Sequence, residues 1–303
     1  MTAPVTTFAP PPPPAPAGAP PPVSPGGRTA VRVLIVVAAA ALVVGCVLSL
    51  GTVAWGLSSF RVIADAKTLP AGMKSLIIDT GQIPAAVRIT ADRNAREPRV
   101  TMRLINSNRG GEHGLVVTGD AGATRLTLAG ERSSLPDFGR AGELNVTLPP
   151  DLARKLSVTT QQETGVLLAQ TDLDQIVVHN TDADVVLSAG ARRIEIHTQD
   201  GDVATREPIS VTEAFVADGM DGNVTVDFKD AAPRTVEVVT RDGDVALAMP
   251  TTGPYLVHAQ SGDSTRVRVP ETTEASRAVA EVTARSDNGA VTISTLGTRP
   301  MRR

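Results

Sequence analysis

The sequence predicts an all-β fold: a β-solenoid of stacked coils of about 20 residues, preceded by one transmembrane helix and a disordered Pro-rich tail. Three observations predict the folded part. A small residue recurs seven times between polar neighbours, and each recurrence is followed by a short strand signal. The strand signals alternate apolar and polar residues, as half-buried strands do. No comparable stretch carries the 3.6-residue apolar stripe of a helix.

The seven small residues lie at near-regular intervals. Steps between them are 18, 18, 21, 21, 19 and 27 residues, and a period near 20 is typical of repeats that share one core. A β-sandwich stays the alternative, because Asp-Gly turns also close antiparallel hairpins. The seven corners are Thr164-Gly165-Val166, Ala183-Asp184-Val185, Gly201-Asp202-Val203, Gly222-Asn223-Val224, Gly243-Asp244-Val245, Gly262-Asp263-Ser264 and Gly289-Ala290-Val291.

The N-terminal segment, residues 1–30, holds eleven of the 23 prolines among Ala, Gly and Ser. Such a segment has few side chains to bury and loses a backbone donor at each proline, so we expect an extended, disordered tail. A spacer is the simplest role for it, and a docking motif for a partner is the alternative.

Residues 31–60 are predicted to form one transmembrane helix. Their apolar part, Val33 to Leu57, would be about 38 Å long as a helix, enough to cross a hydrocarbon core of about 30 Å. Arg28 and Arg32 precede it as in a signal anchor, so we expect the N-terminus in the cytoplasm and the β domain outside.

Two processing events are alternatives to an uncleaved span. The run Val43-Val44-Gly45-Cys46 is similar to a bacterial lipobox, whose cysteine is lipidated, and Thr52-Val53-Ala54 could serve as a cleavage site. The sequence stays apolar to Trp55, however, whereas a processed lipoprotein normally continues into a polar tether. An uncleaved span is therefore favoured.

Beyond the span we expect a linker at 61–73, the β-repeat domain at 74–296 and a short tail at 297–303. Within the repeats, Ile194 and Ile196 should face inward while Glu195 and His197 face out. The strand signals before the repeats are 76–78, 87–89, 100–104, 115–117, 126–128 and 144–148.

Charge and composition exclude several classes of partner. Setting aside the three N-terminal arginines leaves 26 Lys and Arg against 32 Asp and Glu from residue 62 onward, a formal net charge of −6. Nucleic acid, whose phosphates require a basic surface, is therefore not expected. Aromatic residues are 2% of the chain and Tyr255 is the single tyrosine, so stacking platforms for bases or sugars are scarce.

No residue pattern identifies a catalytic, cofactor-binding or metal site. The Asp-rich corners offer oxygens to calcium, but they lack the dense spacing of calcium-binding β-rolls, so turn chemistry is the simpler explanation. The histidines are too scattered for zinc. The loop Gly110–Gly114 lacks the lysine and helix of a phosphate loop. The corner aspartates are Asp200, Asp202, Asp242, Asp244 and Asp263, and the histidines are His113, His179, His197 and His258.

At the level of the repeats the chain resembles the putative-adhesin family of the DUF4097 type. The resemblance rests on residues 143–149, Leu156-Ser157-Val158, the Asp-Gly-Asp-Val corners at 200–203 and 242–245, and residues 288–293, and it spans about 74–296. It implies a stacked β-repeat ectodomain, often membrane-attached, with no catalytic residues to transfer. The Pro-rich tail and the Ala/Val/Arg/Thr-rich domain are similar to an actinobacterial envelope protein.

Three functional hypotheses follow. The first is a non-enzymatic, adhesin-like binding or scaffolding protein of the cell envelope, whose partners are the lipid bilayer and a cell-wall polymer or an envelope protein. The second is a transmembrane signalling adaptor that uses its Pro-rich tail. The third is a polysaccharide-acting hydrolase or lyase whose paired acids would include Asp202 and Asp244.

Overall fold

The computed structural model describes residues 42, 60–107, 114–129 and 141–297. The chain divides into two units, Met1–Ser58 and Ser59–Arg303, and all described residues except Leu42 belong to the second. The predicted tail, the predicted span and Cys46 lie outside the described residues. Within the described ranges, no helix has both the length and the apolar character needed to cross a membrane.

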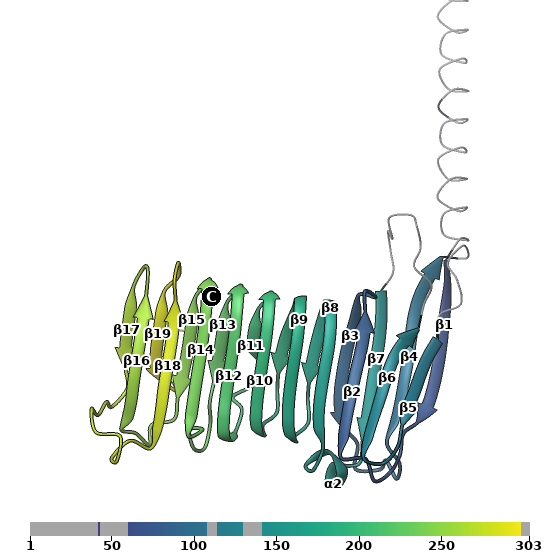
Figure 1. The fold of residues 1–303 in the computed structure, drawn as a ribbon, viewed down its shortest axis with the longest axis horizontal. Coiled ribbons are helices and arrows are strands. Elements are labelled where there is room, and N and C mark those ends of the chain that lie inside the picture. The colour runs from purple at the N-terminus through teal and green to yellow at the C-terminus, as the bar shows by residue number, and fades with distance from the viewer. Residues whose placement is uncertain (1–41, 43–59, 108–113, 130–140, 298–303) are drawn as a thin grey trace, which may run out of the picture. The chain divides into compact units, whose positions relative to one another are not determined.

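The second unit is all-β, which confirms the predicted fold class (Figure 1). Its one described helix is the short turn α2 (Pro150–Ala153), which begins at a proline suited to the first turn of a helix. The strands are β1 (Phe60–Thr68), β2 (Ser75–Gly81), β3 (Ala85–Ala91), β4 (Arg99–Ser107), β5 (Gly114–Gly119), β6 (Ala123–Ala129), β7 (Ala141–Leu148), β8 (Ser157–Ala169), β9 (Leu173–Leu187), β10 (Ala191–Asp200), β11 (Val203–Thr205), β12 (Val211–Asp221), β13 (Val224–Asp227), β14 (Thr235–Asp242), β15 (Val245–Met249), β16 (Tyr255–Ser261), β17 (Thr265–Arg268), β18 (Ala280–Ser286) and β19 (Val291–Thr295).

The strands form two rows, and each coil contributes one strand to each row on either side of a corner. All pairings between successive coils are parallel, as stacked coils require. The long strands β8 and β9 run through their corners and take part in both rows. The first row runs β2, β8, β9, β10, β12, β14, β18, β16, and the second runs β3, β8, β9, β11, β13, β15, β19, β17.

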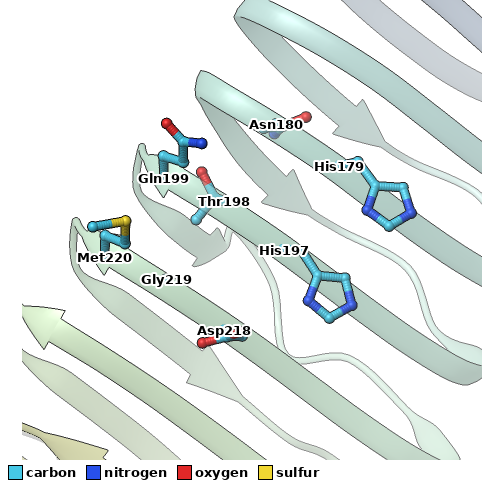
Figure 2. A pocket seen from close by; sticks show the side chains of 8 residues that line it. All are labelled: His179, Asn180, His197, Thr198, Gln199, Asp218, Gly219 and Met220. Atoms are coloured by element: carbon cyan, nitrogen blue, oxygen red, sulfur yellow. The ribbon is translucent and has the colours of Figure 1, made fainter.

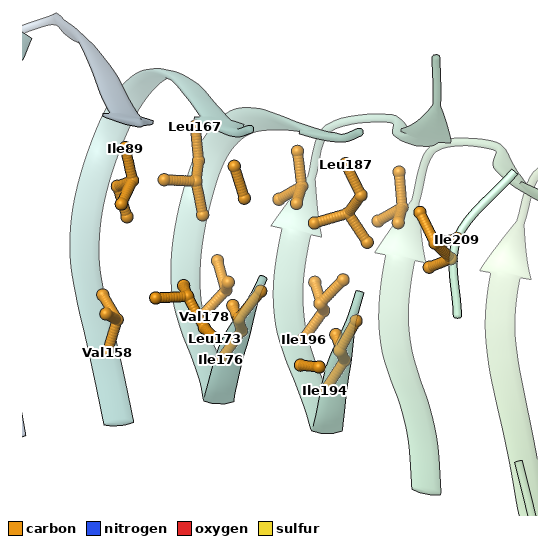
Figure 3. Packing of buried hydrophobic residues seen from close by; sticks show 14 of the residues in the cluster. Ile89, Val158, Leu167, Leu173, Ile176, Val178, Leu187, Ile194, Ile196 and Ile209 are labelled. Atoms are coloured by element: carbon orange, nitrogen blue, oxygen red, sulfur yellow. The ribbon is translucent and has the colours of Figure 1, made fainter. Parts of the chain in front are cut away.

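Alternation along each strand places the core between the two rows. Ile194 and Ile196 are fully buried, and Glu195 and His197 lie on the outer side, as predicted. Figure 3 shows how equivalent aliphatic side chains of neighbouring coils pack on one another, for example Val178 on Ile196. Each coil therefore shields the apolar side of the next, and no coil could bury its own side chains alone.

The last two coils do not stack in the order of the sequence. The strands β18 and β19 pair with β14 and β15, and β16 and β17 pair on their far side. The long step of 27 residues before Gly289 provides the chain that returns past the outer coil. Part of that segment covers the edge of β16, where the Tyr255 N–H donates to the Pro270 carbonyl over 2.8 Å.

At the N-terminal end, β6 and β7 extend the two rows by parallel pairing with β2 and β3, and antiparallel pairs join them. The strand β1 pairs with β4, β4 pairs with β7, and β5 pairs with β6. The segment 61–73, predicted to be a linker, thus contains most of a nine-residue strand, β1. Its sequence, FRVIADAKT, alternates less clearly than the repeats, and pairing with β4 makes it a strand. Among the described strands, the antiparallel pairs of the sandwich alternative occur only at this end.

Candidate binding surface along the glycine corner

The corners of successive coils lie in one row. At these corners the backbones of neighbouring coils approach each other closely. Gly201, Gly222 and Gly243 have φ of 140°, 121° and 139°, values that L side chains rarely adopt. A Cβ added at Gly222 would lie 2.8 Å from the carbonyl carbon of Gly201 and closer still to its oxygen. Glycine is needed at these three corners for both reasons, as predicted. The predicted corner at Gly262 is offset from the row, because a Cβ there would meet the Asp287 carbonyl rather than Gly289. The corner of β9 is the exception, because Ala183 fills it while remaining buried.

An inward row of polar side chains holds these corners, and the sequence analysis missed it. The Asn180 side-chain amide donates to the Ala183 carbonyl over 3.1 Å, and the Ser286 hydroxyl donates to the Gly243 carbonyl over 2.8 Å. The signal was present in the spacing, since a polar or small residue stands three positions before each of six corners. Its members are Gln162, Asn180, Thr198, Gly219, Thr240 and Ser286.

The residue after each corner forms an outer ladder that links coil to coil. The Asp202 N–H donates to Asp184 Oδ1 over 2.9 Å, and the Asn223 N–H donates to Asp202 Oδ1 over 2.8 Å. The ladder continues from the Asp244 N–H to Asn223 Oδ1 and from the Ala290 N–H to Asp244 Oδ1. These oxygens accept N–H groups of the neighbouring coil, so the aspartates link successive coils, whereas the sequence predicted that they would bond within their own turns.

The residue before each corner forms a second ladder, in which neighbouring carboxylates repel one another. In-register pairing places Asp221 between Asp200 and Asp242, one on each neighbouring strand. A hydrogen bond shared with Asp200 raises the pKa of the Asp221 carboxyl above its usual value, and desolvation and Asp242 raise it further. The next coil relieves the charge, because the Asn288 side-chain amide donates to Asp242 Oδ1 over 2.6 Å.

We expect Asp221→Asn to stabilise the fold at neutral pH. Because the pKa of Asp221 is raised in the folded state, its contribution to stability falls as pH rises from the usual carboxyl pKa to the raised one, and the full penalty is present above that window. The melting temperature of the variant should exceed that of the wild type at pH 7, and the gain should shrink in acid.

The matched control for this prediction is Asp263→Asn, which changes a carboxylate at the Gly262 corner. The Asp263 N–H bonds to the Ser261 hydroxyl, and this corner belongs to the outermost coil. It should leave the melting temperature nearly unchanged at both pH values. A gain at Asp221 that persisted at low pH would show that charge repulsion is not its cause.

A shallow hollow lies on the outer face of the first row, close to the corners. Its volume is about 230 Å³, and the rings of His179 and His197 stack on one side of it with centroids 5.4 Å apart (Figure 2). Parallel register places Asp218 directly beside His197. Met220, 43% exposed, lies at the corner end of the hollow and gives it an apolar contact. In the sequence these histidines look scattered, because the register that brings them together is not visible there.

A charged cluster lies on the same three strands, at their other end. The Arg192 guanidinium pairs with Asp174 over 2.9 Å and also with Glu213, and both carboxylates raise its pKa. Arg193 pairs with Glu195 beside it. The cluster joins β9, β10 and β12 across the outer face. Because these side chains are well exposed, we expect the cluster to favour the correct strand register rather than to add much stability.

His258 and Tyr255 do not join this surface. His258 lies on β16 near Glu281, and Tyr255 is buried with its hydroxyl donating to the Pro250 carbonyl over 2.6 Å. Neither therefore adds a group to the hollow. His113 and the loop at 110–113 fall outside the described residues.

The outer ladder uses the carboxylates of the corner aspartates Asp202 and Asp244. In the described ranges, no group of three His, Cys, Asp or Glu side chains is arranged to hold a metal ion. Asp202 and Asp244, the acids of the hydrolase hypothesis, are separated by the coil that carries Asn223. Each accepts a backbone N–H from the next coil. The ladder thus gives them a structural role.

Gly219 is the one member of the inward polar row without a side chain, and it lines the hollow. A Cβ added there would meet its nearest atom, Thr198 Cγ2, at 3.5 Å, an ordinary contact. We expect Gly219→Ala to raise the free energy of unfolding by about 0.4–1 kcal/mol, because alanine reduces the freedom of the unfolded chain. Urea titration followed by circular dichroism measures this, and a lower midpoint would contradict it.

Comparison with known proteins gives one family match. The family model described as Toastrack DUF4097 matches residues 116–295, which is more than half of the chain. These residues include the corners, the hollow and both outer ladders. No curated protein matches the chain.

Several solved structures resemble the chain. A "putative adhesin" from Bacteroides fragilis NCTC 9343 is 12% identical with a TM-score of 0.47, and the match covers 78% of this chain and 97% of that one. Another from Parabacteroides merdae ATCC 43184 is 9% identical with a TM-score of 0.45, covering 77% and 96%. A "putative lipid binding protein" from Parabacteroides distasonis ATCC 8503 is 10% identical with a TM-score of 0.38, covering 77% and 96%.

Proposed function

Because the chain belongs to the Toastrack DUF4097 family, we propose that it is a membrane-attached, extracytoplasmic β-repeat protein that binds an envelope partner without chemical turnover. The apolar run at 33–57 supports attachment to the bilayer, and Arg28 and Arg32 before it support a cytoplasmic N-terminus. Repeat proteins commonly bind through the extended surface that their stacked units create.

The observation that carries the binding role is the hollow on the outer face of β9, β10 and β12. It combines two stacked imidazoles, the Asp218 carboxylate and the exposed Met220 thioether within one concave area. Polar groups beside an apolar contact suit recognition of a protein segment, since methionine adapts to irregular partners.

The charge next to the hollow indicates the kind of segment. Asp200 and Asp221 stand at the corner end of β10 and β12, and the outer ladder adds Asp184 and Asp202. Such a surface attracts basic groups and repels anionic wall polymers. We therefore favour a basic segment of an envelope protein over a cell-wall polymer.

Protease treatment of intact cells tests the location. We expect digestion of the chain beyond residue 61 and protection of an epitope placed in residues 1–30. A β domain that is digested only after the cells are lysed would contradict the extracytoplasmic location, whatever the binding partner.

Photo-cross-linking in living cells tests the binding surface. A photoreactive amino acid in place of Met220 should form an adduct of defined mass, and the same residue in place of the exposed Lys229 serves as the control. The adduct should disappear when His197→Ala and Asp218→Ala are combined with the probe. An adduct that forms equally from position 229, or that survives both substitutions, would contradict a site at the hollow.

A further inference from the structure

The inward polar row differs between the two halves of the stack. In the later coils its hydroxyls bond to corner carbonyls, as Ser286 does with Gly243 over 2.8 Å. Ser261, the register partner of Ser286 on β16, bonds to the Gly289 carbonyl over 2.6 Å. In the first coils the row carries amides. Each amide uses its NH₂ group on the corner, as Gln162 does with the Ala85 carbonyl over 3.1 Å and Asn180 with that of Ala183. The carbonyl oxygen of each amide is then left over.

Among the described residues, six buried side-chain oxygens have no partner, and four of the six belong to β2, β8 and β9. These four are Gln162 Oε1, Asn180 Oδ1 and the hydroxyls of Thr80 and Thr160. Gln162, Thr80 and Thr160 are 3%, 0% and 0% exposed; Asn180 is 8% exposed and lines the hollow, but its Oδ1 atom is buried. A buried polar group without a partner is destabilising, and four of them together are unusual in a folded protein.

Strand register places the four residues together. Gln162 on β8 lies beside Asn180 on β9, and on its other side the bulge of β2 brings Thr80 and Gly81 next to it. Thr160 precedes Gln162 by two residues on the same strand and also points inward. The oxygens thus belong to three consecutive coils and face one region of the interior, just below the corner.

We propose that internal water occupies this region and bridges the three coils. The two amide oxygens can only accept hydrogen bonds, and the two hydroxyls can donate, which matches the two donors and two acceptors of a water molecule. A bound cation fits less well, because no carboxylate is among the four groups and an uncompensated buried charge is costly. The ligand class is therefore neutral water, held at the junction between the N-terminal coils and the regular repeats.

The direction in which one substitution shifts the melting temperature distinguishes a hydrated site from a dry one. The positions equivalent to Thr160 on the neighbouring strands are Ile78, Val178 and, one coil further, Ile196, so the space accepts a valine. If the hydroxyl has no partner, Thr160→Val removes a penalty and raises the melting temperature. If it bonds to water, the same change lowers the melting temperature by about 2–4 °C.

We expect Thr160→Val to lower the melting temperature of the full chain in detergent micelles. Thr240→Val is the matched control, because the Thr240 hydroxyl lies within 3.4–3.5 Å of the Met220, Gly222 and Asp242 carbonyls, and its loss should also lower the melting temperature. A higher melting temperature for Thr160→Val, beside a lower one for Thr240→Val, would overturn the proposal.

Two further measurements separate water from a cation and do not depend on how the variants fold. The melting temperature of the wild type should be the same in sodium, potassium, calcium and choline chloride at equal ionic strength. A crystal structure of the full chain should show an ordered peak within hydrogen-bond distance of Gln162 Oε1 and Asn180 Oδ1. Stabilisation by one of the metal ions, or a region without ordered density, would overturn the proposal.

Discussion

Gly222→Ala should lower the free energy of unfolding by about 2–6 kcal/mol, one of the two largest effects expected in this protein. Two costs combine at this corner. Alanine is strained at a φ of 121°, and its Cβ would overlap the Gly201 carbonyl of the preceding coil. The neighbouring coil cannot move aside without breaking the row of stacked strands. Urea unfolding followed by far-ultraviolet circular dichroism measures the loss.

Two glycines provide controls that separate these costs. Gly297→Ala introduces the same type of strain at a φ of 91°, but the added Cβ meets nothing within 4 Å. It should therefore lower the free energy of unfolding only by the conformational cost, at most about 1–3 kcal/mol at this chain end. Gly219→Ala tests a nearby glycine with neither cost. If Gly222→Ala were no more harmful than Gly297→Ala, the close approach of the corners would not matter for stability.

Phe215→Ala should destabilise the fold by about 3–5 kcal/mol. Phe215 and Phe228 are fully buried, and their rings meet edge to face at 5.4 Å and 81°. The chain has only five phenylalanines, and aliphatic residues of neighbouring coils are too small to fill the space of a lost ring. The coil formed by β12 and β13 should loosen first, which hydrogen exchange of its amides would show.

The control for this prediction lies on the same strand. Met220→Ala removes a side chain of similar length that is 43% exposed, and it should change the free energy of unfolding by less than about 1 kcal/mol. Phe228→Ala combined with Phe215→Ala should cost less than the sum of the single changes, because the two rings contact each other. Full additivity would show that the edge-to-face contact contributes nothing beyond burial.

The sequence predicts the class of fold and the position of the corners because both depend on local patterns. Ile194 and Ile196 face inward through the two-residue period of a strand, and Gly201, Gly222 and Gly243 stand where the backbone needs a positive φ. These requirements act within a few residues of the chain. They are therefore visible without knowledge of which strand pairs with which.

Features that depend on pairing could not be predicted. His179 and His197 are 18 residues apart in the sequence, and only parallel register stacks their rings and sets Asp218 beside them. The strand β1 owes its place to β4, and its own sequence is weakly alternating. The order of the last two coils is set by which strands pair with β14 and β15, and the sequence pattern within each coil does not show this.

The exchanged order of the last coils has a consequence for how the chain is completed during synthesis. When residues 255–268 emerge, the neighbour that they need, residues 280–295, has not yet been made. The C-terminal end must therefore assemble as one late event, after the rest of the stack. A chain that stopped just before Ala280 would lose two coils of the stack at once, and proteases would cleave its unpaired strands.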